Sequence, residues 1–374
     1  MEIIKKKKEE QPIRVLHVIH GLGSGGAESI LMGLFKNVDR NKYHFDFLIR
    51  SKNNIYEKDI KQLGGCVYTA PPFPSHIIKN YKYTKNLIKS KKYSVIHVHG
   101  NALIYVYPLI IAKRLGIPCR IMHSHNTSAA KKVYYPIHII NKYRIRNVVN
   151  IRLACSEAAG NWMFGKDKFY IVENGINISQ FKFNQDVRML YRNRLGIRDK
   201  FVIGNVARFL PSKNHFFLLK IFREILEQME NALLILIGEG PEEEKIKKLA
   251  EELGMNDSII FLGKRNDVNC LMQAMDIFIL PSNFEGLGIV LIEAQAASLP
   301  CVASDIIPKE SKISELIEYV SLNSPPHIWA EQVLKLYKTV RREENSLSLQ
   351  ESSYNIEKCA KKLEKIYSKA LDRS

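Results

Sequence analysis

Two carboxylates lie eight residues apart in the segment FEGLGIVLIEA at 284–294. Glu285 sits in a glycine-rich stretch, and Glu293 sits in an otherwise apolar one. An acid among apolar residues is costly to bury unless its oxygens accept hydrogen bonds, and the two hydroxyl groups of a ribose suit a carboxylate. Gly286 and Gly288 leave backbone amides free near the start of a helix, where a phosphate is stabilised. The spacing favours a nucleotide site; a coincidental pair of acids is the alternative.

A second charged pair, Arg208 and Lys213, lies in ARFLPSKN at 207–214, between a strand-like run and a helical pattern. An arginine fork beside a lysine point charge is suited to a diphosphate. Basic residues are common in loops, so the pair indicates a diphosphate site only together with the two acids.

Histidines gather at the ends of two strand-like runs. The segment HSHN ends one run with His123, His125 and Asn126, and His97 and His99 end the preceding run. A zinc site would need a third ligand, and the sequence offers no obvious carboxylate nearby. We therefore favour a single histidine that hydrogen-bonds a substrate; purely structural histidines are the alternative.

A glycine-rich turn, GLGSGGAE at 21–28, directly follows the first strand-like run and opens a helix. It contains the pattern G-x-G-x-x-G at Gly21, Gly23 and Gly26. Such turns cradle a dinucleotide when an acid ends the second strand and holds the ribose. Here that strand ends in Arg50 and Ser51, with Asp46 inside it. The NAD interpretation is weakened, although an arginine would tolerate NADP; a turn without a ligand is the other alternative.

Apolar runs alternate with helical patterns along the whole chain, and this rhythm predicts parallel sheets covered by helices on both faces. The predicted strands are 14–20, 44–49, 94–100, 119–125, 152–156, 201–208, 232–240, 259–263, 276–282 and 300–305. The predicted helices are 27–38, 102–116, 215–229, 242–254, 290–298 and 355–371.

The fold class predicted from this rhythm is α/β, with two doubly wound, Rossmann-like domains facing each other across a cleft. We expect a first domain at 1–178, a second at 179–352, and a C-terminal amphipathic helix at 353–374 that needs an apolar surface to cover its apolar face. Parallel sheets bind ligands at the carboxyl ends of their strands, where the motifs above lie.

Composition excludes several classes of protein. The chain has 374 residues, of which 46% are hydrophobic and 25% charged, as in ordinary globular proteins. We expect no membrane-spanning helix and no secretory signal, because no apolar run is long enough. The six cysteines are scattered without a CxxC pair, which favours a reduced, cytoplasmic setting.

The net charge of +18 is concentrated in the first half of the chain. Residues 1–180 contain 29 Lys and Arg against 11 Asp and Glu, whereas residues 181–374 contain 27 of each. Such a basic half attracts nucleic acid, anionic lipid or phosphorylated substrates. A soluble surface from a lysine-rich proteome is the alternative.

The motifs and their order resemble glycosyltransferase family 4, the retaining enzymes of GT-B fold, and most closely its capsule and exopolysaccharide members. The resemblance is carried by GGAE at 25–28, HSHN, VENGIN at 172–177, the Arg…Lys pair and the two acids with seven residues between them. It covers most of the chain, and it implies that the C-terminal helix at 353–374 crosses back to the first domain.

This resemblance implies a role for each motif residue. On the donor side, Arg208 and Lys213 would grip the pyrophosphate and stabilise the leaving group, and Glu293 would bind the ribose hydroxyls. Glu285 would contact the transferred sugar, and His125 would touch the sugar near the reaction centre. The remaining donor residues would be Gly25, Gly26, Arg265, Gly286, Leu287, Gly288 and Ile289. The acceptor side would hold Glu28, His123 and Asn126, and the choice between His123 and His125 toward the sugar stays open.

The resemblance also implies a nucleotide sugar, with UDP as the default nucleotide, and no cofactor or metal ion. No DxD pattern occurs, so fixed cations would replace magnesium. Retention would follow from attack on the same face of the sugar; Glu285 as a covalent nucleophile is the less favoured route.

The basic first half would then hold the acceptor. The segments 76–93 and 131–146 mix Lys and Arg with Tyr and Ile, as in stretches that lie on anionic membranes. We expect a peripheral enzyme on the inner face of the cell membrane with a polyprenyl-diphosphate-linked glycan as acceptor. A solvated basic face with a soluble acceptor is the alternative.

Three other functions fit parts of the sequence. An NADP-dependent oxidoreductase would leave both charged pairs unexplained. A nucleotide-sugar 2-epimerase shares the two-domain build and needs no acceptor. A nucleic-acid binder would use the basic half, but no recognised binding module is evident, so we expect no nucleic acid as partner.

Overall fold

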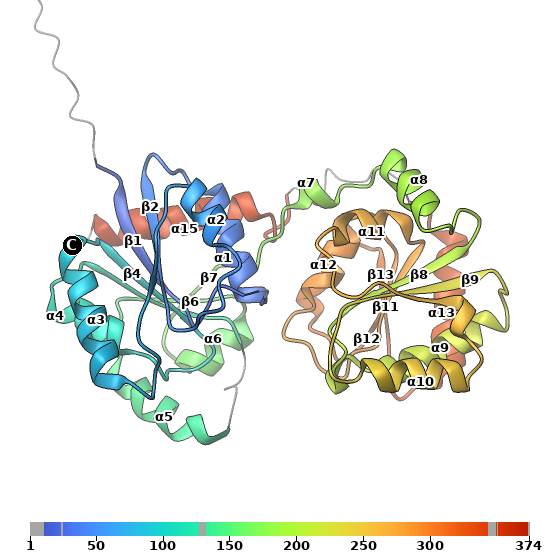
Figure 1. The fold of residues 1–374 in the computed structure, drawn as a ribbon, viewed down its shortest axis with the longest axis horizontal. Helices are drawn as coiled ribbons and strands as arrows, with labels where there is room; N and C mark the ends of the chain where they lie inside the picture. Colours follow the sequence, from blue (N-terminus) through green and yellow to red (C-terminus); the bar gives the residue numbers. More distant parts are fainter. Residues whose placement is uncertain (1–10, 24, 127–131, 343–348, 350, 373–374) are drawn as a thin grey trace, which may run out of the picture. The chain divides into compact units, whose positions relative to one another are not determined.

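The computed structural model describes residues 11–23, 25–126, 132–342, 349 and 351–372. These form two compact α/β units, each built on one parallel sheet (Figure 1). The first unit runs to Gly175 and also takes in the chain from Ile356 onward, while the second is Ile176–Asn355. Both divisions fall three residues from the boundaries expected at 178 and 352.

The first sheet has seven parallel strands in the order β3-β2-β1-β4-β5-β6-β7. The strands are β1 (Ile13–Val18), β2 (Tyr43–Ile49), β3 (Val67–Thr69), β4 (Val95–Gly100), β5 (Cys119–Ser124), β6 (Ile151–Ala154) and β7 (Tyr170–Ile171). The chain winds outward from β1 to β3 and then returns to place β4 on the other side of β1. This reversal makes the carboxyl ends of β1 and β4 the natural ligand position of the unit.

Six α-helices precede the domain division in the described part of the first unit. They are α1 (Gly26–Asn37), α2 (Glu57–Gln62), α3 (Ile77–Ser90), α4 (Tyr107–Arg114), α5 (Tyr135–Arg144) and α6 (Glu157–Phe164). Successive strand residues point to opposite faces of the sheet. Ile96, Val98 and Met122 pack in one hydrophobic core with residues of α4. The alternate positions of β4 and β5 carry histidines instead.

The last helix, α15 (Ile356–Leu371), packs against α1 of the first unit. Its apolar stripe buries Ile356, Cys359 and Leu363. Ile366 is only half-buried, and Tyr367 takes the interior position beside it. The chain therefore returns to complete the fold of its first unit.

The second sheet has six parallel strands in the order β10-β9-β8-β11-β12-β13. The strands are β8 (Phe201–Val206), β9 (Ala232–Ile237), β10 (Ile259–Phe261), β11 (Ile277–Leu280), β12 (Cys301–Ser304) and β13 (Ile317–Val320). The helices are α7 (Ile178–Phe181), α8 (Gln185–Arg194), α9 (His215–Leu226), α10 (Glu243–Glu252), α11 (Val268–Ala274), α12 (Ile289–Ala296) and α13 (Pro326–Thr339). The sheet order reverses between β8 and β11.

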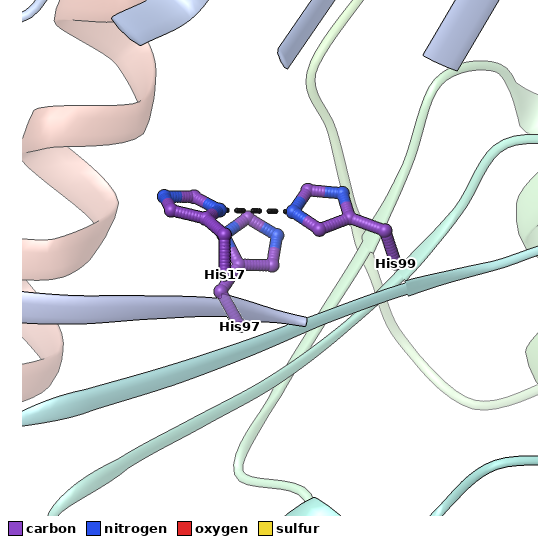
Figure 2. A group of neighbouring side chains, drawn as sticks. All are labelled: His17, His97 and His99. Atoms are coloured by element: carbon purple, nitrogen blue, oxygen red, sulfur yellow. Dashed lines mark hydrogen bonds between the residues drawn. The ribbon is translucent and has the colours of Figure 1, made fainter. Parts of the chain in front are cut away.

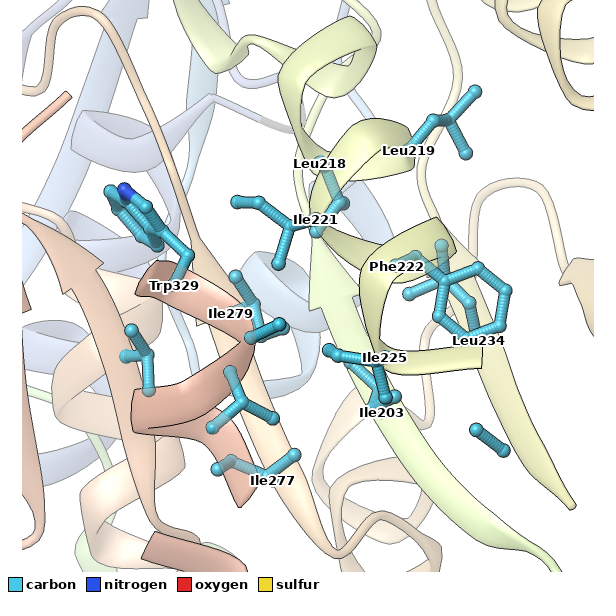
Figure 3. Close-up of a cluster of buried hydrophobic side chains, with 14 of the residues drawn as sticks. Ile203, Leu218, Leu219, Ile221, Phe222, Ile225, Leu234, Ile277, Ile279 and Trp329 are labelled. Carbon is cyan, nitrogen blue, oxygen red and sulfur yellow. The ribbon is translucent and has the colours of Figure 1, made fainter. Parts of the chain in front are cut away.

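Two apolar cores flank the second sheet. On one face, α9 and Trp329 of α13 cover the isoleucines of β8 and β11, as Figure 3 shows. On the other face, Leu271 of α11 and Leu291 of α12 pack with Phe278 of β11. Burial on both faces fixes the sheet, and with it the loops that leave its carboxyl edge.

The predicted α/β class with two Rossmann-like units is confirmed. The helix expected at 102–116 was wrong in its start, because it begins at Tyr107 with Pro108 in its first turn. Proline lacks an amide hydrogen and is tolerated only there. Several elements were not predicted, among them β3, β7, β13, α2, α6, α8 and α13. Among the described residues, no helix has the length and apolar character needed to cross a bilayer.

Candidate active site

The clearest charged contact at the carboxyl edge of the second sheet joins Lys213 and Glu285. The Lys213 Nζ donates to Glu285 Oε1 at 2.6 Å, and the Ser282 hydroxyl donates to the same oxygen at 2.8 Å. The Glu285 side chain is 8% exposed and that of Lys213 is 22% exposed. Both side chains are largely shielded from solvent, so the attraction between their charges is stronger than it would be in bulk water.

Sheet order explains this contact. The loop holding Lys213 follows β8, the loop holding Glu285 follows β11, and these two strands are neighbours. Two hydrogen bonds to backbone carbonyls join the loops, since Asn283 N donates to Ser212 O at 2.8 Å and the Asn283 side-chain Nδ2 donates to Pro211 O at 3.0 Å. Two motifs that are 72 residues apart in the chain therefore form one site.

Two glycines after β9, Gly238 and Gly240, allow the loop after β9 to pack tightly against the loop after β8. Gly238 has φ +145°, and a Cβ atom built on it would lie 1.9 Å from the carbonyl oxygen of Ala207. A Cβ on Gly240 would lie 2.4 Å from the carbonyl oxygen of Phe209. Glycine is therefore required where the β9 loop supports the backbone around Arg208.

Glu293 lies on α12, between the fully buried Ile292 and Ala294. Burial raises the pKa of its carboxyl to about 7, because the charged form loses its hydration. An acid held ready to ionise near neutral pH is suited to a ligand whose hydroxyl groups compensate the buried charge.

The glycine-rich segment leads into α12. Gly288 is the residue before the helix and has φ +79°, a conformation that favours glycine. Gly286 has open space where a Cβ would be. Leu287 is buried in a small apolar cluster with Ile292, and Ile289 opens the helix. The first turn of α12 contains no acid, so its free amides and the helix dipole favour an anion.

Two further predicted donor residues are exposed. Arg208 follows β8 and forms no ion pair with any residue that the structure describes. Arg265 follows β10, and its guanidinium donates to both oxygens of Asp267 at 2.9 and 2.7 Å. This contact raises the pKa of Arg265 and lowers the pKa of Asp267. Asp267 also accepts from Tyr191 at 2.9 Å.

In the first unit, the glycine-rich turn leads into α1. Gly25 precedes the helix, Gly26 is its first residue, and Glu28 is the acid of its first turn. A Cβ on Gly25 would lie 2.2 Å from Glu28 Oε2, so the acid folds back over the turn. A Cβ on Gly26 would meet nothing within 4 Å.

His97 and His99 of β4, His123 of β5 and His125 just after β5 come together with a fifth histidine, His17 of β1. His17 is aligned with His97, and His99 with His123, in the strand registers. Burial lowers the pKa of all five, to about 3 for His17 and about 4 for His125. His123 is 1% exposed and bonded inward to His97, whereas His125 lies half-buried at the strand end, beside Asn126.

The third histidine that a metal site would need is therefore supplied by the fold. Among the described residues, two groups could hold a metal ion, and both consist of three histidines: His17, His97 and His99, and His99, His123 and His125. The sequence expectation did not include His17, although its place in the first predicted strand was a signal.

The two residues that a dinucleotide site would use, Asp46 and Arg50, contact other side chains instead. Asp46 is fully buried inside β2, bonded to Arg14 at 2.5 Å and to Tyr93 at 2.9 Å. Hydrogen bonds lower its pKa to about 2 despite its burial. The Arg50 guanidinium lies 4.0 Å from the ring centroid of Tyr105. Neither is presented to a ribose as an NAD or NADP site requires.

Sequence reasoning missed Ser282 as a partner of Glu285 and Tyr367 as a partner of the histidines. Ser282 ends the predicted strand at 276–282, one turn before the acid, which was an available signal. Nothing in the sequence pairs Tyr367 of α15 with His97 of β4, because 270 residues separate them.

Comparisons with known proteins bear on both units. Residues 24–180 match the family model described as Glycosyltransferase Family 4, and residues 187–347 match Glycosyl transferases group 1. The EpsF glycosyltransferase of Bacillus subtilis is 33% identical over 336 residues, which cover 86% of this chain and 87% of EpsF. The chain belongs to glycosyltransferase family 4.

Two further proteins similar to this family 4 enzyme have a lower sequence identity than EpsF. The UDP-Gal:alpha-D-GlcNAc-diphosphoundecaprenol alpha-1,3-galactosyltransferase of Escherichia coli is 25% identical over 232 residues, 59% of this chain and 60% of the relative. The solved structure of Anabaena HepE in complex with UDP superposes with a TM-score of 0.79 at 18% identity, covering 96% of this chain and all of HepE. The likeness to HepE confirms the GT-B fold class.

The family decides among the functions weighed from the sequence. The protein is a glycosyltransferase, so the oxidoreductase and epimerase alternatives were wrong. The contacts of Asp46 with Arg14 and of Arg50 with Tyr105 also argue against a dinucleotide site.

Proposed function

We propose that this glycosyltransferase moves a hexose or N-acetylhexosamine, with retention, from a UDP-sugar to a polyprenyl-diphosphate-linked glycan during capsular or exopolysaccharide synthesis. The observation that carries the donor half is the Lys213–Glu285 pair, at the strand ends where the second sheet reverses its order.

In this proposal, Lys213 and Arg208 hold the diphosphate. When the bond between the sugar C1 and the diphosphate oxygen breaks, negative charge grows on the leaving group, and fixed cations lower that barrier. Lys213 already lies in a set geometry against Glu285 at 2.6 Å. Transfer would then need no metal ion at the diphosphate.

Glu293 would accept hydrogen bonds from the ribose hydroxyls, and the amides of Gly286–Ile289 would bind sugar and phosphate. Arg265 lies after β10, at the position proposed to read the base through its backbone. Support for UDP comes from two similar proteins, since the Escherichia coli relative is named for UDP-Gal and HepE was solved with UDP.

The reaction would join the acceptor hydroxyl to C1 on the face that the diphosphate leaves. The acceptor proton would pass to the departing diphosphate oxygen, so that no covalent enzyme intermediate forms. Glu285 would contact the transferred sugar. His125 is proposed to touch it because it is more accessible than His123. Glu28 and the turn at Gly25–Gly26 would border the acceptor.

The lipid-linked acceptor is supported by apolar residues exposed on a basic unit. On and beside α5, the exposed side chains are Val133, Tyr135, Ile137, Ile140 and Tyr143, and α3 adds Ile77, Ile78 and Tyr83. Lysines interleave with them, as at Lys79, Lys82 and Lys142. Such surfaces insert apolar groups at the headgroup level of anionic membranes. We therefore propose a peripheral enzyme on the inner membrane face; residue 131 of the predicted segment lies outside the described residues.

The donor site is tested with wild type, Lys213→Ala and the exposed control Lys220→Ala against UDP, GDP, UDP-sugars and NADP. We expect UDP and one UDP-sugar to raise the melting temperature of wild type and control. Lys213→Ala should lose most of this shift. Stabilisation by NADP alone, equal in all three proteins, would refute the donor assignment.

The membrane part is tested by sedimentation with vesicles of phosphatidylglycerol and phosphatidylcholine. Replacing Ile137 and Ile140 by serine should release the enzyme from the anionic vesicles, whereas Leu190→Ser in the second unit should not. Equal binding of all three proteins would refute this surface. NMR of the anomeric proton in the product would test retention.

A further inference from the structure

Five histidines form a continuous cluster at the carboxyl edge of the first sheet. They come from β1, β4, β5 and the residue after β5. Figure 2 shows His17, His97 and His99 turned toward one another, with their rings on the same face of neighbouring strands. A buried group of five imidazoles is more than a fold needs, since apolar side chains would fill the same space without polar atoms.

Hydrogen bonds link the imidazoles into two separate series. In one, His125 Nε2 lies 2.8 Å from His99 Nδ1, and His99 Nε2 lies 2.9 Å from His17 Nδ1. In the other, His123 Nδ1 lies 3.2 Å from His97 Nε2, and His97 Nδ1 lies 2.7 Å from the Tyr367 hydroxyl. Within the described part of the chain, His123 Nε2 and His125 Nδ1 are buried without a partner.

Three of these side chains can converge on one ion. One ring nitrogen from each of His99, His123 and His125 lies within 4.8 Å of the others. In a tetrahedral zinc site with bonds of about 2.0–2.1 Å, ligand nitrogens are about 3.4 Å apart. The His99 and His125 nitrogens at 2.8 Å would need to separate by only about half an ångström.

The outer members of the cluster complete the arrangement. If His99 Nδ1 binds an ion, its Nε2–H can donate to His17. If His123 Nε2 binds, its Nδ1–H can donate to His97, whose own Nδ1–H can donate to Tyr367. Partners of this kind fix the tautomer and the ring orientation of metal-binding histidines.

We propose that His99, His123 and His125 form a binding site for a divalent transition metal ion of the Zn²⁺, Co²⁺ or Ni²⁺ class. Imidazole ligands suit these ions, whereas Mg²⁺ and Ca²⁺ require oxygen. His125 is only half-buried, which gives an ion access that the fully buried His17 and His97 do not offer. The trio contains no carboxylate, so the open fourth position would favour an anionic oxygen.

Occupancy would take the lone pair of His125 away from the sugar, and the enzyme would transfer more slowly with Zn²⁺ bound. This consequence rests on the proposed function of His125. The metal site itself does not, because binding is measured without substrate.

The test is equilibrium dialysis of the untagged full chain against Zn²⁺, with metal content read by mass spectrometry. We expect one ion per chain, not displaced by excess Mg²⁺. His99→Gln and His123→Gln should weaken binding at least 100-fold, and His17→Gln about 10- to 100-fold. The exposed His76→Gln should bind as wild type does. Absence of bound Zn²⁺, or binding that survives both trio variants in folded form, would overturn the site.

The absorption spectrum of Co²⁺-loaded wild type decides the matter if the trio variants do not fold. A tetrahedral spectrum without thiolate charge-transfer bands supports the histidine site. Thiolate bands would assign the ion to one of the cysteines and overturn the proposal. Both metal measurements are made without substrate, so they test the metal site even if the proposed sugar transfer is not observed.

Discussion

The half-buried acid Glu293 makes nucleotide binding depend on pH. Burial raises its pKa to about 7, so about one tenth of the free protein carries the ionised carboxylate at pH 6 and about nine tenths at pH 8. The carboxylate form accepts hydrogen bonds from both ribose hydroxyls. The apparent affinity scales with the fraction of the binding-competent form. We expect the affinity for UDP-glucose to rise about tenfold from pH 6 to pH 8.

The assay is isothermal titration calorimetry with UDP-glucose, whose diphosphate does not titrate in this range. Titrations at pH 7 in two buffers of different ionisation enthalpy should show about half a proton released per nucleotide bound. Glu293→Gln should bind about 10- to 100-fold more weakly at pH 8, because a hydrogen bond to a charged group is lost. Its affinity should not change with pH.

The same pKa sets the pH dependence of stability. Because the folded-state pKa lies above the ordinary value of 4.5, the stability contributed by the protonated acid is fully present below pH 4.5. It is lost as pH rises through about 7. Relative to Glu293→Gln, wild type should lose up to about 3 kcal/mol of unfolding free energy between pH 4.5 and pH 8. The exposed control Glu331→Gln should follow wild type. Equal pH slopes in wild type and Glu293→Gln would refute the reasoning.

Three further changes test the framework. Lys213→Ala should lower kcat about 10²- to 10³-fold with the fold intact, measured by release of UDP; an unchanged kcat would remove Lys213 from the leaving-group site. Gly238→Ala should destabilise the second unit by more than about 2 kcal/mol, because its Cβ meets a backbone carbonyl at 1.9 Å. Gly254→Ala, with open space around it, should cost about 1 kcal/mol of unfolding free energy. Urea titration measures both variants, and equal losses of unfolding free energy for Gly238→Ala and Gly254→Ala would contradict the steric argument. Tyr367→Phe should cost about 1–2 kcal/mol by stranding the buried nitrogen of His97, and no change in the urea midpoint would show that this bond is not needed.

The strand and helix pattern could be predicted from the sequence because burial on both sheet faces leaves near-continuous apolar runs. The runs at 201–208 and 232–240 correspond to β8 and β9, which end within three residues of the predicted limits. Elements dominated by charged residues, such as α8 and α10, differ: α10 has a clear apolar stripe and was predicted, whereas α8 buries only Arg192 and was missed.

The types of the candidate site residues could also be predicted, because glycines, acids and cations after strands carry a local chemical signal. What each of them contacts could not be. Lys213 meets Glu285 only because the sheet places β8 beside β11, and that order depends on pairings far apart in the chain.

By itself, the sequence determined that the chain forms two α/β units with charged and glycine-rich loops at their strand ends, because periodicity and turn chemistry are local. The tertiary structure alone decided that β1, β4, β5 and the residue after β5 bring five histidines together, and that Tyr367 of α15 bonds one of them. It also decided that Asp46 is held by Arg14 inside the sheet. These contacts are non-local, and only the packed fold selects them from the many pairings that the same residues permit.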